Sequence, residues 1–353
     1  MREPEHNDLG VDLDLLSSWM DEQNLAPGKI ENAEALGGGT QNIILRFDRG
    51  GVGYVLRHPP PHKRKNSDET MRREARVLAA IADSDVPHPG LIAACPDESV
   101  LGSAFYLMEP VDGFNATTGL PELHANDPTI RHGMGLSMVD AIAALGRIDY
   151  VEVGLADFGK PDGYLERQVA RWRAQLDGYS ELEGYPGPEI PHVDSVAGWL
   201  DTNRPTHFEP GIIHGDFHLA NVMFRFDGPE LAAAVDWELS TIGDPLLDLG
   251  WLLATWPEPG GGGVGSVGLQ AWDSFPIAEE LVDRYAEQST RDLSCVTWYE
   301  VLACYKLGII LEGTHARAYS GKAPKTVGDA LHATTIGLFE RGHRRILAAE
   351  SPT

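Results

Sequence analysis

The sequence predicts an α+β fold with two lobes, a small N-terminal lobe built on an antiparallel sheet and a larger, mainly helical C-terminal lobe. The chain of 353 residues is too long for one small core, because domains usually hold about 100–200 residues. Its first part alternates short apolar runs with turns rich in glycine and proline, which is typical of strands. Its later part repeats apolar residues at intervals of three and four, the period of a helix. We therefore expect an N-terminal lobe over residues 1–110, a hinge at about 109–113 and a C-terminal lobe over residues 114–353.

The N-terminal lobe is expected to open with a helix and to continue as a β-hairpin. Leu13, Leu16 and Met20 lie at helical spacing, which predicts a helix with one buried face. A glycine-rich segment over residues 36–42 leads into the first hairpin strand, and a turn at 48–51 separates the two strands. The predicted elements of this lobe are the helix after Leu9, strands over 43–47, 52–57 and 104–109, and a helix over 68–82.

The C-terminal lobe is expected to be helical around a small group of strands. Two apolar stripes at helical spacing, over residues 134–145 and 298–309, predict long helices that bury one face. The glycine-rich segment 257–268 predicts a loop. Short strands are predicted over 211–213, 222–226 and 231–235.

Composition and charge exclude several classes of partner. The chain has 28 Lys and Arg against 53 Asp and Glu, a formal net charge of −25. This acidity argues against binding to nucleic acid or to an anionic membrane, both of which need a basic face. It would suit a cationic small molecule. The three cysteines, Cys95, Cys295 and Cys304, lie far apart and form no metal-binding pair, and the first residues carry no apolar signal sequence. A reducing cytoplasm is therefore the expected location.

The segment that carries chemistry begins with His214, Gly215 and Asp216, which directly follow a predicted strand. Asn221 comes five residues after Asp216, and Asp236 follows the next predicted hairpin. Phosphoryl transfer needs a group that accepts the proton of the attacking hydroxyl, together with oxygen ligands for the metal that binds the phosphates. Asp216 can accept the proton, and Asn221 and Asp236 offer the hard oxygen atoms that Mg²⁺ prefers. This spacing therefore predicts a phosphotransferase.

The same run resembles the Brenner motif of the aminoglycoside phosphotransferase and choline kinase families, which share the protein-kinase-like fold. The longer stretches 211–218 and 235–250 look like a bacterial group related to the kinase-like domain of acyl-CoA dehydrogenase 10-type proteins. The likeness extends over residues 30–340 or so. It implies ATP-dependent transfer of the γ-phosphate, with Mg²⁺, to a hydroxyl of a small molecule.

The resemblance also implies roles for individual residues of the nucleotide site. Arg57 occupies the place of the strand lysine that contacts the α- and β-phosphates, and Glu74 on the next helix looks like its ion-pair partner. Arg57 is the main departure from the family pattern, because a planar guanidinium replaces a compact ammonium group. The other nucleotide residues implied are Gly38, Gly39, Thr40 and Asn42 in the phosphate loop, and Glu109 and Val111 in the adenine-binding hinge.

For the catalytic residues, the resemblance implies that Asp216 is the catalytic aspartate. It implies that Asn221 and Asp236 are the metal ligands. Asp248 is expected to buttress the catalytic loop, and His214 to support that loop through a hydrogen bond to its backbone.

Several alternatives stay open or are disfavoured. A nucleotide-binding sensor or scaffold without turnover is the main rival, and Arg57 in place of lysine is the feature that favours it. A protein kinase is disfavoured by Gly215, where protein kinases usually have arginine. A zinc hydrolase built on His214 and His218 and a phosphate-binding loop over 154–161 both lack part of their motif. The identity of the acceptor and the oligomeric state do not follow from the sequence.

Overall fold

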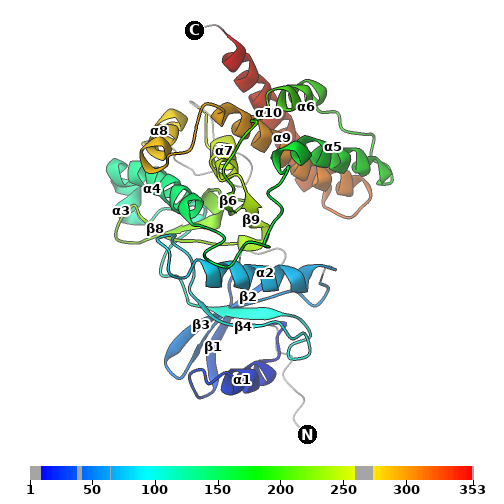
Figure 1. The fold of residues 1–353 in the computed structure, drawn as a ribbon. Coiled ribbons are helices and arrows are strands. Elements are labelled where there is room, and N and C mark those ends of the chain that lie inside the picture. The colour runs from blue at the N-terminus through cyan, green and yellow to red at the C-terminus, as the bar shows by residue number, and fades with distance from the viewer. Residues whose placement is uncertain (1–8, 38–41, 64, 259–272, 352–353) are drawn as a thin grey trace. The chain divides into compact units, whose positions relative to one another are not determined.

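The computed structural model of the protein describes residues 9–37, 42–63, 65–258 and 273–351 (Figure 1). Its contacts divide the chain into two compact units. The first unit comprises Met1–Asp112 together with Ala232–Ser240, and the second comprises Gly113–Leu231 and Thr241–Thr353. The first contains a five-stranded sheet and the second is mainly helical. The predicted α+β class is confirmed.

The first unit is built on an antiparallel sheet with the strand order β1-β2-β3-β5-β4. The predicted hairpin is confirmed as β2 and β3, which pair from Ile43 opposite His58 to Arg49 opposite Val52. Two edge strands, β1 and β4, were not predicted. The elements of this unit are α1 (Leu13–Glu22), β1 (Ile30–Ala35), β2 (Ile43–Arg49), β3 (Val52–His58), α2 (Ser67–Ala80), β4 (Leu91–Cys95), β5 (Phe105–Met108) and the 3₁₀ helix η5 (Trp237–Leu239).

The alternation of side chains along β3 assigns its two faces. Tyr54 and Leu56 point into an apolar core that also holds Leu16 and Trp19 of α1. Because successive side chains of a strand point to opposite faces, Arg57 lies on the other face of the sheet. There α2 packs against β4 and β5. The sheet is therefore covered by α1 on one face and by α2 on the other.

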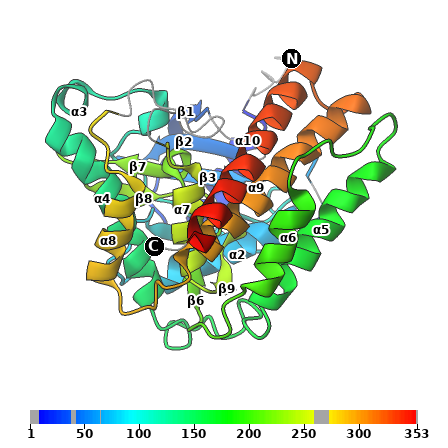
Figure 2. The same ribbon diagram turned by 90° about the horizontal axis from the view of Figure 1, so that it is seen from above.

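The second unit consists mainly of helices, and its long helices contain the two predicted apolar stripes. Figure 2 shows α9 and α10 running side by side. Its helices are α3 (Glu122–Asn126), α4 (Pro128–Arg147), α5 (Gln168–Gly178), α6 (Val193–Thr202), α7 (Leu246–Thr255), α8 (Ala278–Gln288), α9 (Val296–Tyr319) and α10 (Lys325–Glu350). The remaining strands of the chain are β6 (Gly211–Ile213), β7 (Val222–Phe224), β8 (Leu231–Ala234) and β9 (Thr241–Gly243).

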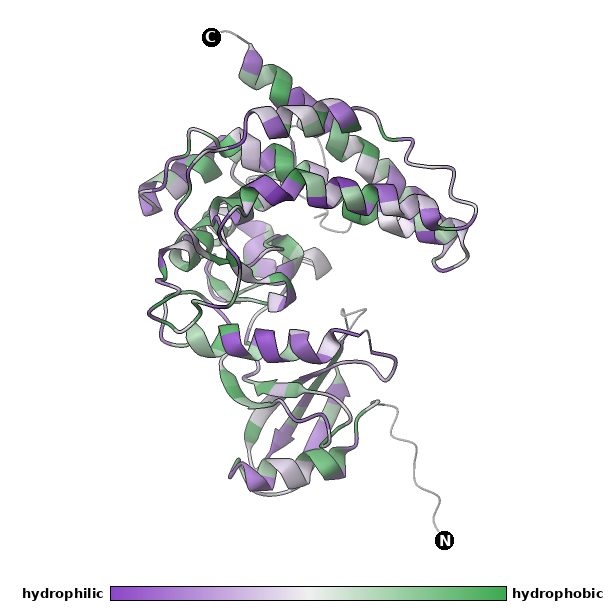
Figure 3. Cartoon of the chain, turned by 45° about the vertical axis from the view of Figure 1, so that its right-hand side comes forward, coloured by the Kyte–Doolittle hydropathy of each residue, from purple (hydrophilic) through white to green (hydrophobic). Residues whose placement is uncertain are grey.

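The core that supports the catalytic segment lies between helices α7, α9 and α10. Trp251 of α7, Cys304 of α9 and Leu338 of α10 belong to one buried apolar cluster. Figure 3 shows hydrophobic and hydrophilic residues interspersed along the helices, as expected of helices that bury one face. Strand β6 pairs with β9, which places Ile212 opposite Ile242, and both side chains are fully buried. The strand that leads into His214 is therefore firmly anchored.

The predicted glycine-rich loop over 257–268 lies mostly outside the described residues. Within the described ranges, no helix combines the length and the apolar character needed to cross a lipid bilayer.

Candidate active site

The catalytic turn follows β6 directly and is held by Asp248. Gly215 has φ of +86°, a backbone conformation that a residue with a side chain rarely adopts. The backbone N–H of His214 donates to Oδ2 of Asp248 at 2.7 Å, and that of Gly215 donates to Oδ1 at 2.8 Å. Burial raises the pKa of Asp248 to about 6, although these two hydrogen bonds oppose the rise. Asp248 therefore fixes the turn, as the buttressing hypothesis requires.

Both carboxylate oxygens of Asp216 are held by neighbours in the same loop. His218 Nε2 lies 3.3 Å from Oδ1, and the side-chain amide of Asn221 donates to Oδ2 at 2.9 Å. His218 Nδ1 accepts the backbone N–H of Ala220 at 3.2 Å, so Nε2 carries the ring proton and donates to Asp216. The turn thus presents Asp216 in one defined orientation. Sequence reasoning considered His218 only as a zinc ligand and missed this positioning contact.

The electrostatic surroundings of Asp216 keep it ionised. Burial alone would raise its pKa, but the His218 hydrogen bond and the charges of His218, His214 and Lys306 outweigh burial and lower the pKa to about 2. An aspartate with this pKa is a stable anion at neutral pH. It can accept hydrogen bonds from a hydroxyl group at any physiological pH.

Lys306 is a functional candidate that the sequence did not reveal. It lies on α9, within the stripe that was interpreted as core, and its Nζ donates to the main-chain carbonyl of Gly215 at 3.1 Å. The ammonium group lies 4.3 Å from the ring centroid of Trp251 and 5.6 Å from that of Trp172, distances at which an aromatic face attracts a cation. Burial lowers the pKa of Lys306 to about 8, although Asp216 and Asp248 oppose the decrease.

In the first unit, the predicted ion pair between Arg57 and Glu74 is present. Arg57 Nε lies 2.9 Å from Oε2 of Glu74, and the hydroxyl of Tyr106 donates to the same oxygen at 2.8 Å. Burial raises the pKa of Glu74 to about 7, against the opposing charge of Arg57 and the Tyr106 hydrogen bond. Burial lowers the pKa of Arg57, but the interactions with Glu74, Tyr106 and Asp236 raise it by more. The pKa of Arg57 therefore lies above its usual value. Arg57 is therefore a permanent cation.

Arg57 makes a second ion pair that was not predicted. Its Nη2 donates to Oδ1 of Asp236 at 2.6 Å, so one guanidinium joins a helix carboxylate to the proposed metal ligand. Asp236 has a left-handed backbone, with φ of 67° and ψ of 65°. Such a conformation is uncommon for a residue with a side chain and is enriched at functional sites. Its side chain is 36% exposed, so Asp236 is accessible to a ligand.

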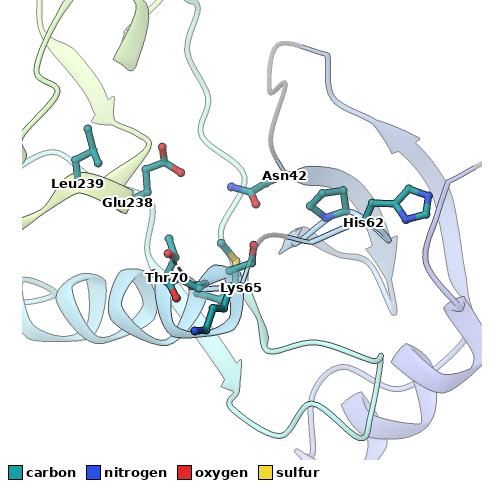
Figure 4. Close-up of a pocket in the computed structure, with 10 residues that line it drawn as sticks. Asn42, His62, Lys65, Thr70, Glu238 and Leu239 are labelled. Atoms are coloured by element: carbon teal, nitrogen blue, oxygen red, sulfur yellow. Dashed lines mark hydrogen bonds between the residues drawn. The ribbon is translucent and has the colours of Figure 1, made fainter. Parts of the chain in front are cut away.

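A pocket of about 530 Å³ opens beside the predicted phosphate loop (Figure 4). Figure 4 shows Asn42 and Glu238 pointing toward one another from opposite sides of this pocket, with the start of α2 along a third side. Gly38, Gly39 and Thr40 of the predicted phosphate loop come shortly before Asn42 in the sequence and lie outside the described residues. The other lining residues are Pro60, His62, Lys65, Asn66, Ser67, Thr70, Met71 and Leu239.

The predicted hinge residues follow β5. The backbone N–H of Glu109 donates to the carbonyl of Gly90 at 2.8 Å. The structure thus places Asn42, Glu109 and Val111 in the first unit, where Arg57 pairs with both Glu74 and Asp236. It places the second set of candidate residues, His214, Asp216, Asn221 and Asp248, around one turn of the second unit.

Two of the alternatives find no support in this geometry. Residues 149–164 form turns rather than the strand, loop and helix of a phosphate-binding loop. For the zinc hydrolase, the two histidines considered as ligands, His214 and His218, each use Nδ1 to accept a backbone N–H of the catalytic loop. The contact of His214 with the N–H of Asp216 is long, at 3.4 Å.

The fold and the catalytic turn define a kinase-like phosphotransferase, and comparison with known proteins agrees. The family model described as "Phosphotransferase enzyme family" matches residues 32–286. The chain belongs to this family. A protein of Ralstonia eutropha JMP134 classed with the aminoglycoside phosphotransferases has the same fold, with a TM-score of 0.78, 30% identity, and coverage of 95% of this chain and 99% of that chain. The predicted protein-kinase-like fold is confirmed.

The curated relatives are much longer proteins. Acyl-CoA dehydrogenase family member 11 of Gallus gallus is 32% identical over 86% of this chain, a match that spans 39% of that protein. Acyl-CoA dehydrogenase family member 10 of Mus musculus is 29% identical over 84% of this chain and 28% of that protein. The chain thus spans less than half of each. A more distant likeness is to an aminoglycoside phosphotransferase in complex with ADP and hygromycin B, with a TM-score of 0.56, 12% identity, and coverage of 93% and 98%.

Proposed function

We propose that the protein is an ATP-dependent phosphotransferase that moves the γ-phosphate to a hydroxyl group of a small molecule, with Mg²⁺. The observation that carries this proposal is the environment of Asp216. Its carboxylate is ionised, is held at both oxygens by His218 and Asn221, and lies in a turn that Asp248 fixes from behind. A purely structural turn does not need an oriented anion of this kind.

Asp216 would act on the proton of the acceptor hydroxyl. The acceptor oxygen forms a bond to the γ-phosphorus, the bond from that phosphorus to the β,γ-bridging oxygen breaks, and ADP leaves. The hydroxyl proton passes to Asp216. A carboxylate with a pKa of about 2 is too weak a base to deprotonate a free alcohol, so the proton moves late, once the forming bond has made it acidic. This order agrees with the loose transition state of phosphoryl transfer.

Asn221 and Asp236 would hold Mg²⁺, which when bound neutralises charge on the phosphates. The donor chemistry fits, because both side chains offer hard oxygen atoms. The side-chain amide nitrogen of Asn221 makes the hydrogen bonds to Asp216, which directs the amide carbonyl oxygen elsewhere. Asp236 uses Oδ1 for Arg57 and has a second oxygen to offer.

The first unit would bind the nucleotide. Arg57 supplies a permanent cation for the phosphates, held in place by Glu74. The pocket is lined by Asn42, the last residue of the segment expected to bind those phosphates. The carbonyl of Glu109 and the N–H of Val111 would recognise adenine. Distant aminoglycoside phosphotransferases form complexes with ADP in one structure and with GDP in others, which supports a nucleotide site in this fold.

The acceptor is a hydroxylated small molecule, and two chemistries deserve a test. The net charge of −25 favours a cationic acceptor, the class to which the hygromycin B of the distant relative belongs. The curated relatives are named acyl-CoA dehydrogenases, which makes an acyl thioester with a hydroxyl group the second class. Measuring KM at increasing salt concentrations separates the two classes. Salt screens the attraction of a cationic acceptor, whose KM should rise, and the repulsion of an anionic acceptor, whose KM should fall.

The rival is a nucleotide-binding protein without turnover. It is favoured by the 2.6 Å contact of Arg57 with Asp236, because a guanidinium on a metal ligand competes with the metal. Under this reading Mg·ATP would bind with no phosphate transferred. The rival therefore predicts that ATP raises the melting temperature but that no ADP is released.

The test is acceptor-dependent ADP release. A panel of aminoglycosides, amino alcohols and hydroxyacyl thioesters is incubated with Mg·ATP, and the phosphorylated product is identified by mass spectrometry. We expect at least one acceptor to yield product with the wild type and none with Asp216→Asn. Binding of Mg·ATP without product across the panel would favour the rival. Failure to bind nucleotide at all would overturn both.

A further inference from the structure

Helices α9 and α10 carry the same short pattern of metal-binding side chains. Glu312 precedes His315 by three residues on α9, and Asp329 precedes His332 by three residues on α10. Residues three apart lie on one face of a helix. The helices also approach closely here, because a Cβ atom on Gly328 would lie 2.7 Å from Cβ of Ala318. The two patterns therefore face each other.

Three of these side chains converge. The ligand atoms of Glu312, His315 and His332 all lie within 4.8 Å of one another. Oε2 of Glu312 lies 2.7 Å from Nδ1 of His332, and the two imidazole rings stack with centroids 4.3 Å apart at 16°. Glu312 is fully buried and His315 is 7% exposed. A buried carboxylate thus lies beside two stacked imidazoles.

One ligand atom in the cluster has no hydrogen-bond partner. Among the described residues, nothing hydrogen-bonds to Nδ1 of His315, which is buried. The nearest carboxylate oxygen, Oδ1 of Asp329, lies 3.7 Å away, which is beyond hydrogen-bonding distance. A buried polar atom without a partner is costly and calls for an explanation. A cation between these groups would provide one, since an imidazole nitrogen binds a metal through the same lone pair.

We propose that Glu312, His315 and His332 bind a divalent transition metal, with zinc as the best match. Two imidazoles and a carboxylate are an established ligand set for zinc. Tyr185 donates to Oε1 of Glu312 at 2.6 Å, and such a contact orients a ligating carboxylate. Asp329 or water would complete the coordination.

Binding would rearrange the cluster slightly and release a proton. Two ligand atoms each about 2.0 Å from a tetrahedral ion lie about 3.3 Å apart. The contact between Glu312 and His332 would therefore lengthen, while the wider separations in the cluster would shorten. The hydrogen-bonded proton on Nδ1 of His332 is replaced by the metal.

The position of the cluster indicates a structural role. Glu312 lies six residues beyond Lys306 on α9, about 9 Å along the helix axis at 1.5 Å per residue. The metal would join α9 to α10 and, through Tyr185, to the segment that follows α5. It would thereby rigidify the helix that carries Lys306. This inference does not depend on the proposed phosphotransferase activity.

The experiment measures zinc directly on the full chain, purified without a histidine tag. We expect about one zinc per chain after growth in zinc-supplemented medium, since one cluster supplies one site. Cobalt(II), used as a spectroscopic probe, should give the visible absorption of a tetrahedral ion. Zinc at a hundredfold excess over its Kd should raise Tm by about 4 °C, and Mg²⁺ at the same concentration should not.

The zinc content per chain should fall at least tenfold in each of the variants His332→Gln and Glu312→Gln. The matched control is His343→Gln. His343 stacks on His192 with centroids 3.9 Å apart at 9°, yet neither ring hydrogen-bonds to a carboxylate in the described part of the chain, so zinc content should not change. The proposal is overturned if the wild type holds less than about 0.1 zinc per chain and gives no cobalt spectrum, or if His343→Gln loses as much zinc as His332→Gln. The wild-type measurements decide the matter even if a variant fails to fold.

Discussion

The ammonium group of Lys306 donates to the main-chain carbonyl of Gly215, so a side chain from α9 holds the residue that precedes Asp216. In the same turn, the carboxylate of Asp248 accepts the backbone N–H groups of His214 and Gly215. The catalytic turn is therefore fixed by a cation on one side and an anion on the other. Its geometry depends on two helices as well as on its own strand.

Replacing Lys306 by methionine should lower kcat about 10- to 100-fold, because a turn released from its support misplaces Asp216. Wild-type kcat should also fall as pH rises through about 8, where Lys306 loses its proton, and this decrease should be absent from the variant. Steady-state kinetics over pH 6–9 measure both effects. Lys322→Met, at an exposed position beyond the end of α9, is the control. Equal pH profiles in variant and wild type would refute the positioning role.

Replacing Asp216 by asparagine should reduce kcat about 10²–10⁴-fold while ATP affinity stays within a factor of about two, because the change removes a proton acceptor and keeps the shape. Since the pKa of Asp216 is about 2, its protonation cannot cause a loss of wild-type activity between pH 5 and 7. Turnover and calorimetric ATP binding measure the two quantities. Asp227→Asn, on an exposed turn, should be neutral. Substantial residual turnover in Asp216→Asn would leave only an orienting role.

Replacing Arg57 by alanine should destabilise the protein by about 1–3 kcal/mol, because Glu74, whose pKa is already about 7, would take up a proton and remain buried without its partner. The KM for ATP should rise as well. Arg57→Lys should keep part of both functions, although an ammonium group lacks the planar fork that reaches Glu74 and Asp236 together. Urea denaturation and ATP-dependent kinetics test this. Arg46→Ala, at an exposed position on neighbouring β2, is the control. An Arg57→Ala protein as stable as the wild type would contradict the assignment.

Asp248 makes a specific prediction for stability against pH. Its pKa is about 6 in the folded protein and about 3.9 in the unfolded chain. Between these values the folded state retains a proton that the unfolded state has lost, so stability falls as pH rises from about 4 to 6. The loss amounts to about 3 kcal/mol. Denaturation at pH 4.5 and 7 measures this loss in the wild type and in the variants. The loss of stability should be absent from Asp248→Asn and present in Asp283→Asn, which changes an exposed residue. Parallel pH dependences would refute the prediction.

The sequence could predict those parts of the site that depend on short-range patterns. The family resemblance implied the ion pair between Arg57 and Glu74, and the two residues lie where it expects them, at the end of a strand and on the face of the next helix. The turn at Asp216 was equally local. Edge strands β1 and β4 escaped prediction because both have few residues of strand type: β1 is Ile-Glu-Asn-Ala-Glu-Ala and β4 is Leu-Ile-Ala-Ala-Cys.

Long-range contacts could not be predicted in this way. Asp236 lies 179 residues from Arg57 along the chain, and nothing near either residue indicates that they meet. Lys306 lies 91 residues from Gly215, in a stripe whose neighbours are core residues, so its burial looked like packing. The only local sign was a cation within an apolar helix face. Such a cation must be paired or held over aromatic rings, because burying a charge alone is prohibitive.

The return of Ala232–Ser240 to the first unit has a consequence for how the protein is made. Asp236, which pairs with Arg57, is translated long after β3 has left the ribosome. At about 5–20 residues per second, roughly 6–25 s separate synthesis of residue 112 from that of residue 240. Through this interval the nascent first unit lacks the contact of Arg57 with Asp236. A stalled chain ending at residue 112 should accordingly be more open to proteolysis than one stalled beyond residue 240.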